Sequence, residues 1–157
     1  MTTTACSQTL ETVPEVDLNR YSGLWHEIAR MPSRFEKGCF NVTANYQPTE
    51  KGTIQVINSC DKGTDRKGRT SVEGKAFIVK NSNNTKLKVQ FFWPFRGDYW
   101  IIGLADDYSW ALVGTPSRKY LWVLSRTEEM DMELYQSLLM KAEKMGFNTT
   151  LLENPMK

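Results

Sequence analysis

The chain has 157 residues and a formal net charge of +2, with 40% hydrophobic and 24% charged residues. This length fits one domain with a sizeable core, and this composition excludes a wholly disordered chain. The balanced charge argues against a protein that works on nucleic acid or on an anionic membrane surface. The apolar runs are too short for a membrane-spanning helix. Five Trp, six Tyr and seven Phe favour β-structure or a pocket lined by rings.

The N-terminal residues carry no hydrophobic period, so we expect a tail over 1–15 and a single domain over 16–157. Cys6 follows a small residue, Ala5, as at the end of a bacterial lipoprotein signal. The basic and hydrophobic regions of such a signal do not precede it. Two alternatives stay open. Either the signal has been removed and Cys6 carries the lipid, or the chain is cytosolic and Cys6 is an isolated thiol.

Short runs with strand character follow one another from residue 24 onwards, with turn residues between them. Alternation of apolar and polar residues is clearest in 40–46 and 86–92. The spacing is typical of an antiparallel barrel or sandwich. The predicted strands cover 24–29, 40–46, 53–59, 71–79, 86–92, 98–105, 109–114 and 120–126.

The last part of the chain changes period. Leu134, Leu138 and Ala142 recur at helical spacing and predict one helix over 131–145. Acidic residues at its start, and lysines near its end, suit the helix dipole. One helix after eight strands is the element order that the sequence predicts.

Cys39 precedes one predicted strand and Cys60 follows the next. A hairpin that turns at 47–52 would bring these two ends side by side, so we predict a Cys39–Cys60 disulfide and an oxidising compartment. The alternative is two ordinary buried thiols.

Motifs for catalysis or for cofactor binding are missing from the sequence. His26 is the single histidine, no Gly-x-Ser-x-Gly elbow occurs, and no Cys or His spacing suits zinc. We therefore expect no catalytic residue, no metal and no cofactor. Glu27 shares a face with Trp25, and we expect it to be the partner of a core Arg or Tyr rather than one of an acid–base pair.

Eight meandering strands can close around one small ligand. The predicted inner faces combine small residues, such as Ala44 and Ala76, with large rings, such as Phe91, Tyr99 and Trp122. Small residues opposite large rings would leave a cavity. A filled core is the other interpretation, and the periodicity does not decide between them.

Three ordered segments carry a resemblance to a known family. Gly23 and Trp25, within 21–30, resemble the Gly-x-Trp motif of the lipocalins. The segment 105–113, which contains Tyr108, resembles the third family motif, and 120–127, with Arg126, resembles the last-strand motif. Shorter sequence segments resemble those of the bacterial outer-membrane lipoprotein branch of the family, which is related to apolipoprotein D and the plant temperature-induced lipocalins. Ala105 departs from this branch, where Asp is usual, which bears on the geometry of that turn.

The resemblance implies an all-β fold. This is an eight-stranded antiparallel up-and-down barrel with one C-terminal α-helix packed outside. A 3₁₀ turn near 17–21 would close one end, with Trp25 beneath the barrel and Arg126 lying across its ring. Gly23, Trp25, Tyr108 and Arg126 would then maintain the fold rather than bind ligand. The opposite mouth would stay open, with 31–38 as its lid.

The resemblance also implies a function. The protein would carry or store a small hydrophobic or amphiphilic lipid, a fatty acid or lysophospholipid, in cell-envelope lipid maintenance. It would face the periplasm from the outer membrane, held only by a lipid on Cys6, or be periplasmic. The oligomeric state stays open, a homodimer included. The expected ligand contacts are Met31 and Phe35 on the lid, and Ala44, Tyr46, Val56, Ala76, Phe91, Tyr99, Trp110 and Trp122 in the barrel. Cations expected near a polar head are Arg34, Lys37, Lys62 and Arg96.

The competing hypothesis is an enzyme on the same barrel, of the isomerase or de-epoxidase type, acting on a hydrophobic substrate. Such a site would need a nucleophile inside, and Cys6, Cys39 and Cys60 are the thiol candidates.

Overall fold

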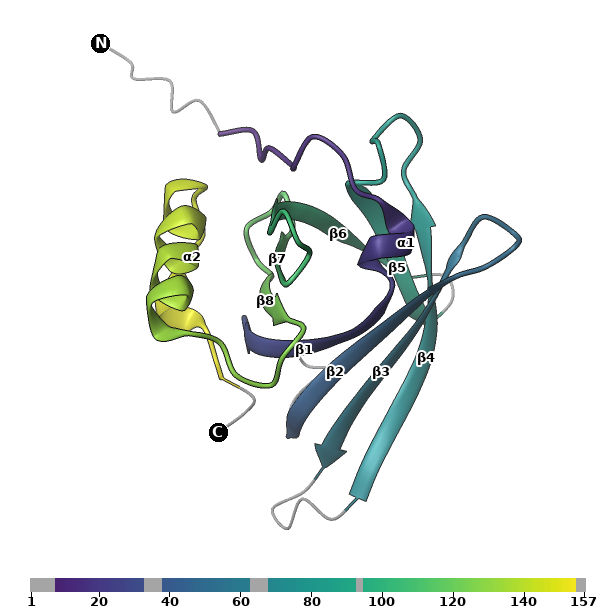
Figure 1. Cartoon of the computed structure of the whole chain (residues 1–157), viewed down its shortest axis with the longest axis horizontal. Helices are drawn as coiled ribbons and strands as arrows, with labels where there is room; N and C mark the ends of the chain where they lie inside the picture. Colours follow the sequence, from purple (N-terminus) through teal and green to yellow (C-terminus); the bar gives the residue numbers. More distant parts are fainter. Residues whose placement is uncertain (1–7, 33–37, 63–67, 93–94, 155–157) are drawn as a thin grey trace.

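The structure is a computed structural model that describes residues 8–32, 38–62, 68–92 and 95–154. Its eight strands follow one another in chain order, each pairs with the next, and β8 pairs back onto β1 (Figure 1). All of these pairings are antiparallel. The predicted eight-stranded up-and-down barrel is therefore confirmed.

The strand bounds agree best with the prediction where alternation is strict. The β5 strand starts and ends where the sequence predicts, whereas β3 and β4 both extend toward the connection between them. The added residues, 60–62 and 68–70, are mostly polar and carry no alternation signal. The strands are β1 Gly23–Arg30, β2 Cys39–Pro48, β3 Ile54–Lys62, β4 Gly68–Ile78, β5 Lys86–Phe92, β6 Phe95–Leu104, β7 Trp110–Gly114 and β8 Leu121–Ser125.

Three helical segments accompany the barrel: α1 Leu18–Tyr21, α2 Met132–Lys144 and η1 Thr149–Leu151. The turn expected as 3₁₀ is a single α-helical turn, because the Tyr21 and Ser22 N–H groups donate to the carbonyls four residues earlier, those of Asp17 and Leu18. The Asp17 carboxylate caps its start. Asp131 caps α2 in the same way. No helix in the described part of the chain combines the length and the apolar composition needed to cross a membrane.

Two apolar clusters hold the domain together. We call the first the interior cluster, since its members, Trp25 and Tyr99 among them, lie on the inner face of the barrel. The second, the helix-side cluster, lies between the outer face of the barrel and α2, where Leu138 and Ala142 meet Leu112 and Val123 (Figure 1). Both faces of β7 and β8 are therefore buried.

Part of the segment expected as a tail runs along the barrel. Leu10 is buried in the helix-side cluster, and the Val13 N–H donates to the Ile101 carbonyl at 3.0 Å. Cys6 lies outside the described residues.

Candidate functional site

The base of the barrel is closed by Trp25, which has no exposed surface. Its indole N–H donates to the Tyr21 carbonyl at 2.8 Å, and the guanidinium carbon of Arg126 lies 3.8 Å from the centroid of its ring. This is the contact that the lipocalin resemblance implies. Cation and ring attract each other, so the pair seals one end of the interior.

Arg126 also holds the chain around this end. Its guanidinium donates to the backbone carbonyls of Arg20, Ser22, Leu24 and Tyr108, at 2.7 to 3.2 Å. Partial burial lowers the pKa of Arg126 from its ordinary value. Gly23 has φ +97°, a conformation that side chains rarely adopt, which explains the glycine at this motif position.

The turn before β7 supports the same end from outside. The Tyr108 hydroxyl accepts the Asp17 N–H at 2.9 Å, and the guanidinium carbon of Arg20 lies 4.1 Å from the Tyr108 ring centroid. Ala105 does not prevent the turn, since its carbonyl accepts the Tyr108 N–H at 2.9 Å.

Three tyrosines meet above Trp25. The hydroxyl oxygens of Tyr21 and Tyr99 lie 2.7 Å apart, and the Tyr46 ring centroid is 5.7 Å from that of Tyr21 and 5.8 Å from that of Tyr99. Burial raises the pKa of both Tyr21 and Tyr99 well above the ordinary value. These phenols therefore stay neutral at physiological pH and make the middle of the barrel an uncharged, ring-lined space.

The rings continue toward the other end of the barrel. Tyr99 is followed by Trp122, with centroids 6.4 Å apart, and Trp122 by Tyr120 at 6.0 Å. Tyr120 is 38% exposed. One interior wall is thus aromatic from the sealed base to the solvent.

This second end is open to solvent. Val72 lies on β4, opposite Asn58 and two residues from the interior residue Gly74, so its side chain faces inward. It is nevertheless 46% exposed. Gly97 lies opposite the interior residue Val89 and is exposed as well. A Cβ atom at Gly97 would meet nothing closer than the Val89 carbonyl oxygen, at 4.0 Å. We call this end the mouth.

A buried ion pair lies on the mouth side of the interior. The Arg30 guanidinium and the Glu27 carboxylate are 3.4 Å apart, and both side chains are almost fully buried. Arg30 also donates to the Cys39 carbonyl at 3.3 Å. The expected core partner of Glu27 is therefore Arg30.

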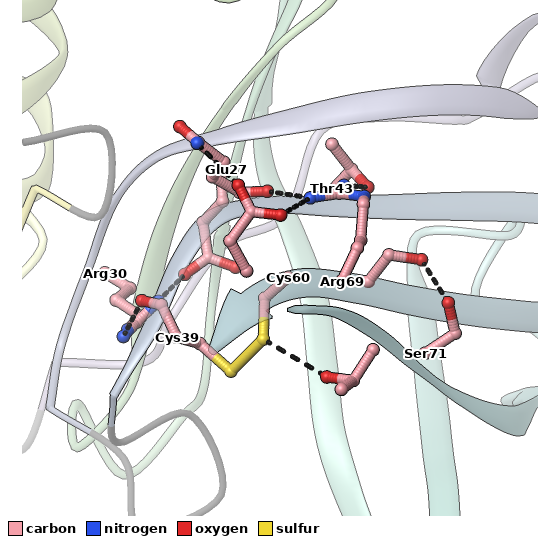
Figure 2. The surroundings of a disulfide bond; sticks show 11 residues. Glu27, Arg30, Cys39, Thr43, Cys60, Arg69 and Ser71 are labelled. Carbon is pink, nitrogen blue, oxygen red and sulfur yellow. Dashed lines mark hydrogen bonds and ion pairs between the residues drawn. A yellow bond between two sulfur atoms is a disulfide. The ribbon is translucent and has the colours of Figure 1, made fainter. Parts of the chain in front are cut away.

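The two predicted cysteines form a disulfide at the mouth (Figure 2). Their Cα atoms lie 5.4 Å apart on neighbouring strands. The bond ties the start of β2 to the end of β3, so the Cys39–Cys60 prediction is confirmed.

Most of the residues expected to contact ligand do face the interior. The interior cluster or its packed neighbours include Ala44, Tyr46, Val56, Ala76, Phe91, Tyr99 and Trp122. Phe35 on the expected lid, like Arg34 and Lys37, lies outside the described residues.

Two expected contacts lie elsewhere: the inward orientation predicted for Trp110 and the lid position predicted for Met31 both differ from the structure. Trp110 alternates with the interior residue Ala111 and packs in the helix-side cluster. Met31 is buried in that same cluster, where its N–H donates to the Leu121 carbonyl. Arg96, expected near a polar head, is exposed, and its guanidinium carbon lies 3.9 Å from the centroid of the Phe77 ring.

A separate pocket of about 390 Å³ lies at the closed end, between α1 and the turn that joins β2 to β3. None of the predicted ligand contacts lines it. Among the described residues, no group of three or more His, Cys, Asp or Glu side chains is placed to hold a metal ion. The ring-lined interior, which reaches solvent at the mouth, is the candidate site.

A family model described as a lipocalin-like domain matches residues 16–157. The chain belongs to the lipocalin family. Among known proteins, this lipocalin is 43% identical over 140 residues to the outer membrane lipoprotein Blc of Citrobacter freundii, covering 89% of this chain and 78% of the relative. It is 39% identical over 153 residues to temperature-induced lipocalin-1 of Arabidopsis thaliana, covering 91% and 80%.

Solved structures agree on the fold. Insecticyanin from the tobacco hornworm Manduca sexta superposes with a TM-score of 0.73, at 20% identity, over 93% of this chain and 83% of that one. The conserved barrel and the apolar, ring-lined interior of this lipocalin are consistent with binding of a hydrophobic ligand.

Proposed function

We propose that this lipocalin carries or stores a single-chain lipid, a fatty acid or a lysophospholipid, with its tail in the barrel and its head at the mouth. The observation that carries the proposal is the contrast between the two ends of the interior. Trp25 and Arg126 seal the base, whereas the inward-facing positions Val72 and Gly97 reach solvent. An extended tail can enter such a space from one side only.

The expected affinity follows from the tail. Burial of about ten methylene groups at about 0.8 kcal/mol each gives roughly 8 kcal/mol before the costs of association. Those costs leave a dissociation constant on the order of 1 μM. The neutral tyrosine group around Tyr99 adds apolar ring surface and no charge.

The Glu27–Arg30 pair supports a polar head at the mouth side. It offers one anion and one cation 3.4 Å apart, which match the phosphate and the ammonium group of a zwitterionic lysophospholipid. A free fatty acid has only a carboxylate, which would compete with Glu27 for Arg30. We therefore expect a lysophospholipid to bind more tightly than a fatty acid of the same chain length.

Binding, rather than catalysis, is the activity that we propose for this interior, because its apolar, ring-lined wall suits a hydrophobic ligand. The location is part of the same proposal. The Citrobacter relative is named an outer membrane lipoprotein, and the Cys39–Cys60 disulfide suits an oxidising compartment. We place this lipocalin in the cell envelope, where Cys6 would carry its lipid anchor.

The test is a titration of the protein with lysophosphatidylethanolamine and with palmitic acid, followed by tryptophan fluorescence and by native mass spectrometry. Trp122 faces the interior and reports on occupancy. The variant Gly97→Phe places a ring into the mouth at a position with free space, and should weaken binding at least about tenfold. Lys75→Phe is the matched control, since Lys75 is exposed on β4 next to the interior residue Ala76. Equal affinities in the two variants, or no binding in the wild type, would refute the proposal.

A further inference from the structure

The charges of the chain are distributed unevenly over the barrel, although their sum is only +2. Residues 75–104 contain five lysine or arginine residues and a single acid, Asp98. Residues 128–144, on and just before α2, contain five acids, all exposed, and two lysines. In the closed barrel β4 lies opposite β8, and Figure 1 shows α2 and β4 on opposite sides. The molecule therefore has a basic side and an acidic side.

The basic side is the outer face of β4, β5 and β6. Ala76, Leu87 and Tyr99 are buried in the interior cluster, so their neighbours along each strand point outward. Six residues of this outer face form a surface that we call the outer patch. They are Lys75 and Phe77 on β4, Lys86 and Lys88 on β5, and Arg96 and Trp100 on β6.

Rings and cations are interleaved in the outer patch. The Lys86 ammonium nitrogen lies 4.2 Å from the Trp100 ring centroid, and the Arg96 guanidinium carbon lies 3.9 Å from the Phe77 ring centroid. Both rings are partly exposed. Aromatic rings favour the headgroup level of a bilayer, and long basic side chains extend from an apolar surface to reach phosphates. The outer patch combines both kinds of side chain on one sheet face.

The charge balance of the outer patch favours an anionic lipid surface as its partner. Lys88 pairs with Asp98, so the patch itself neutralises the acid among its strands. Glu73, the next acid along β4, is held toward β3 by the Gln55 amide at 2.7 Å. Among the described residues, no acid pairs with the other three cations of the patch. A bilayer with anionic headgroups offers counter-charges to all three at once.

We propose that the outer patch docks the barrel sideways on a bilayer that contains anionic phospholipids. Arg96 is next to Gly97, so the patch ends at the rim of the mouth. A barrel docked by this face holds one side of its mouth at the headgroups, where a lysophospholipid leaves the membrane. The docking does not rest on the ligand proposed above, whereas its use in loading does.

The first experiment measures co-sedimentation with vesicles of phosphatidylethanolamine and phosphatidylglycerol, and with vesicles of phosphatidylcholine alone. The protein carries Cys6→Ser, so that no acyl chain can anchor it. At about 0.1 M salt it should bind the anionic vesicles and not the zwitterionic ones, and about 1 M salt should release it, because the Debye length falls to about 3 Å. Equal binding to both kinds of vesicle, or no binding to the anionic vesicles, would overturn the proposal.

The patch variant Lys75→Gln/Lys86→Gln/Arg96→Gln removes three cations from the outer patch. Each basic residue near an anionic surface contributes about fivefold, so vesicle binding should fall about a hundredfold. The matched control Lys51→Gln/Lys119→Gln/Lys144→Gln removes three exposed cations outside the patch, and the total charge changes equally.

The control variant should bind the anionic vesicles within about fivefold of the parent protein, since none of its three lysines belongs to the outer patch. Circular dichroism checks that both variants are folded. A control that loses as much binding as the patch variant would show that only the total charge matters. Patch-dependent binding to heparin without binding to the vesicles would identify an acidic polymer as the partner. Either result contradicts docking on a membrane.

The second experiment tests which face meets the bilayer. In the Cys6→Ser background, Gln90→Cys on the outer face of β5, opposite Lys75, carries an environment-sensitive dye. Its emission should shift to the blue when anionic vesicles are added. The same dye on Gln136→Cys, at the exposed face of α2, should not shift. A shift at Gln136→Cys alone, or equal shifts at both positions, would refute the proposed orientation.

Discussion

Glu27 and Arg30 lie three residues apart on β1, and yet both side chains point into the barrel, with their charged groups 3.4 Å apart. In a regular strand these positions would face opposite sides. The register of β1 against β8 shifts between Glu27 and Ala29, so that Glu27 lies opposite Leu124 and Arg30 opposite Trp122. The bulge thus turns the Arg30 side chain into the barrel, where its positive charge neutralises the Glu27 carboxylate.

Removal of one partner of the Glu27–Arg30 pair should therefore lower the free energy of unfolding more than removal of both partners. Arg30→Met leaves the Glu27 carboxylate buried without its cation, and should lower the free energy of unfolding by about 3–5 kcal/mol. Glu27→Leu/Arg30→Met should be more stable than Arg30→Met. Urea unfolding followed by far-UV circular dichroism measures both.

The control for this pair lies on the outer face. Lys88 and Asp98 form a partly exposed ion pair on neighbouring strands, and Lys88→Met should change stability by about 0–1 kcal/mol. If Arg30→Met costs no more than Lys88→Met, the Glu27 carboxylate is not confined in the interior.

Arg126 and Arg20 provide a second comparison between two similar side chains. Both guanidinium groups lie over a ring, at 3.8 Å from the Trp25 centroid and 4.1 Å from the Tyr108 centroid. Arg126 also donates to four backbone carbonyls, whereas Arg20 is exposed and donates to the Asp106 carbonyl. Arg126→Ala should cost about 2–4 kcal/mol of unfolding free energy, and Arg20→Ala about 1 kcal/mol or less. Equal losses in urea unfolding would show that the carbonyl contacts of Arg126 add nothing.

Much of the fold could be predicted because one face of each early strand is polar. Strict alternation predicts β5 to the residue, and the spacing of Cys39 and Cys60 in one hairpin predicts the disulfide. The same rule fails at β7. Trp110 and the three residues after it are all apolar, because α2 covers the outer face, so the sequence does not show which side is inside.

Irregular geometry explains the other differences. The inward position of Arg30 depends on a bulge that has no signature in the sequence, and Met31 turns outward just after it. The strands are also of unequal length, since β4 starts at Gly68 and pairs with β5 only from Lys75 onwards. Neither feature can be derived from hydrophobic periodicity.

The tyrosine group predicts how stability depends on alkaline pH. Burial raises the pKa of Tyr21 and Tyr99 well above 10.0, so below pH 10 both phenols are protonated in the folded and unfolded states. Above that pH the unfolded chain loses these protons while the folded protein keeps them. Stability is therefore complete below the unfolded pKa and decreases as the pH rises toward the folded pKa, by about 2–3 kcal/mol per pH unit for two groups.

The variant Tyr21→Phe/Tyr99→Phe should be less stable at pH 8, because it loses the 2.7 Å contact between the hydroxyls, but it should lack this part of the alkaline slope. Unfolding free energies measured from pH 9 to 12 give the slope. Tyr120→Phe, at the exposed end of the ring series, should keep the wild-type slope. Parallel slopes in all three proteins would refute the assignment to Tyr21 and Tyr99.

Gly74 and Gly68 test how tightly the interior is packed, since both lie on β4 and differ in their surroundings. A Cβ atom at Gly74 would lie 2.6 Å from the Phe91 ring and 2.7 Å from the Gln90 carbonyl oxygen, whereas one at Gly68 would meet nothing within 4 Å. Gly74→Ala should therefore cost about 1–3 kcal/mol of unfolding free energy by overpacking. Gly68→Ala should be neutral or stabilise by up to about 1 kcal/mol, because it restricts the unfolded chain. If Gly74→Ala is as stable as Gly68→Ala, the Phe91 ring moves freely inside the barrel and does not form a fixed wall of the ligand site.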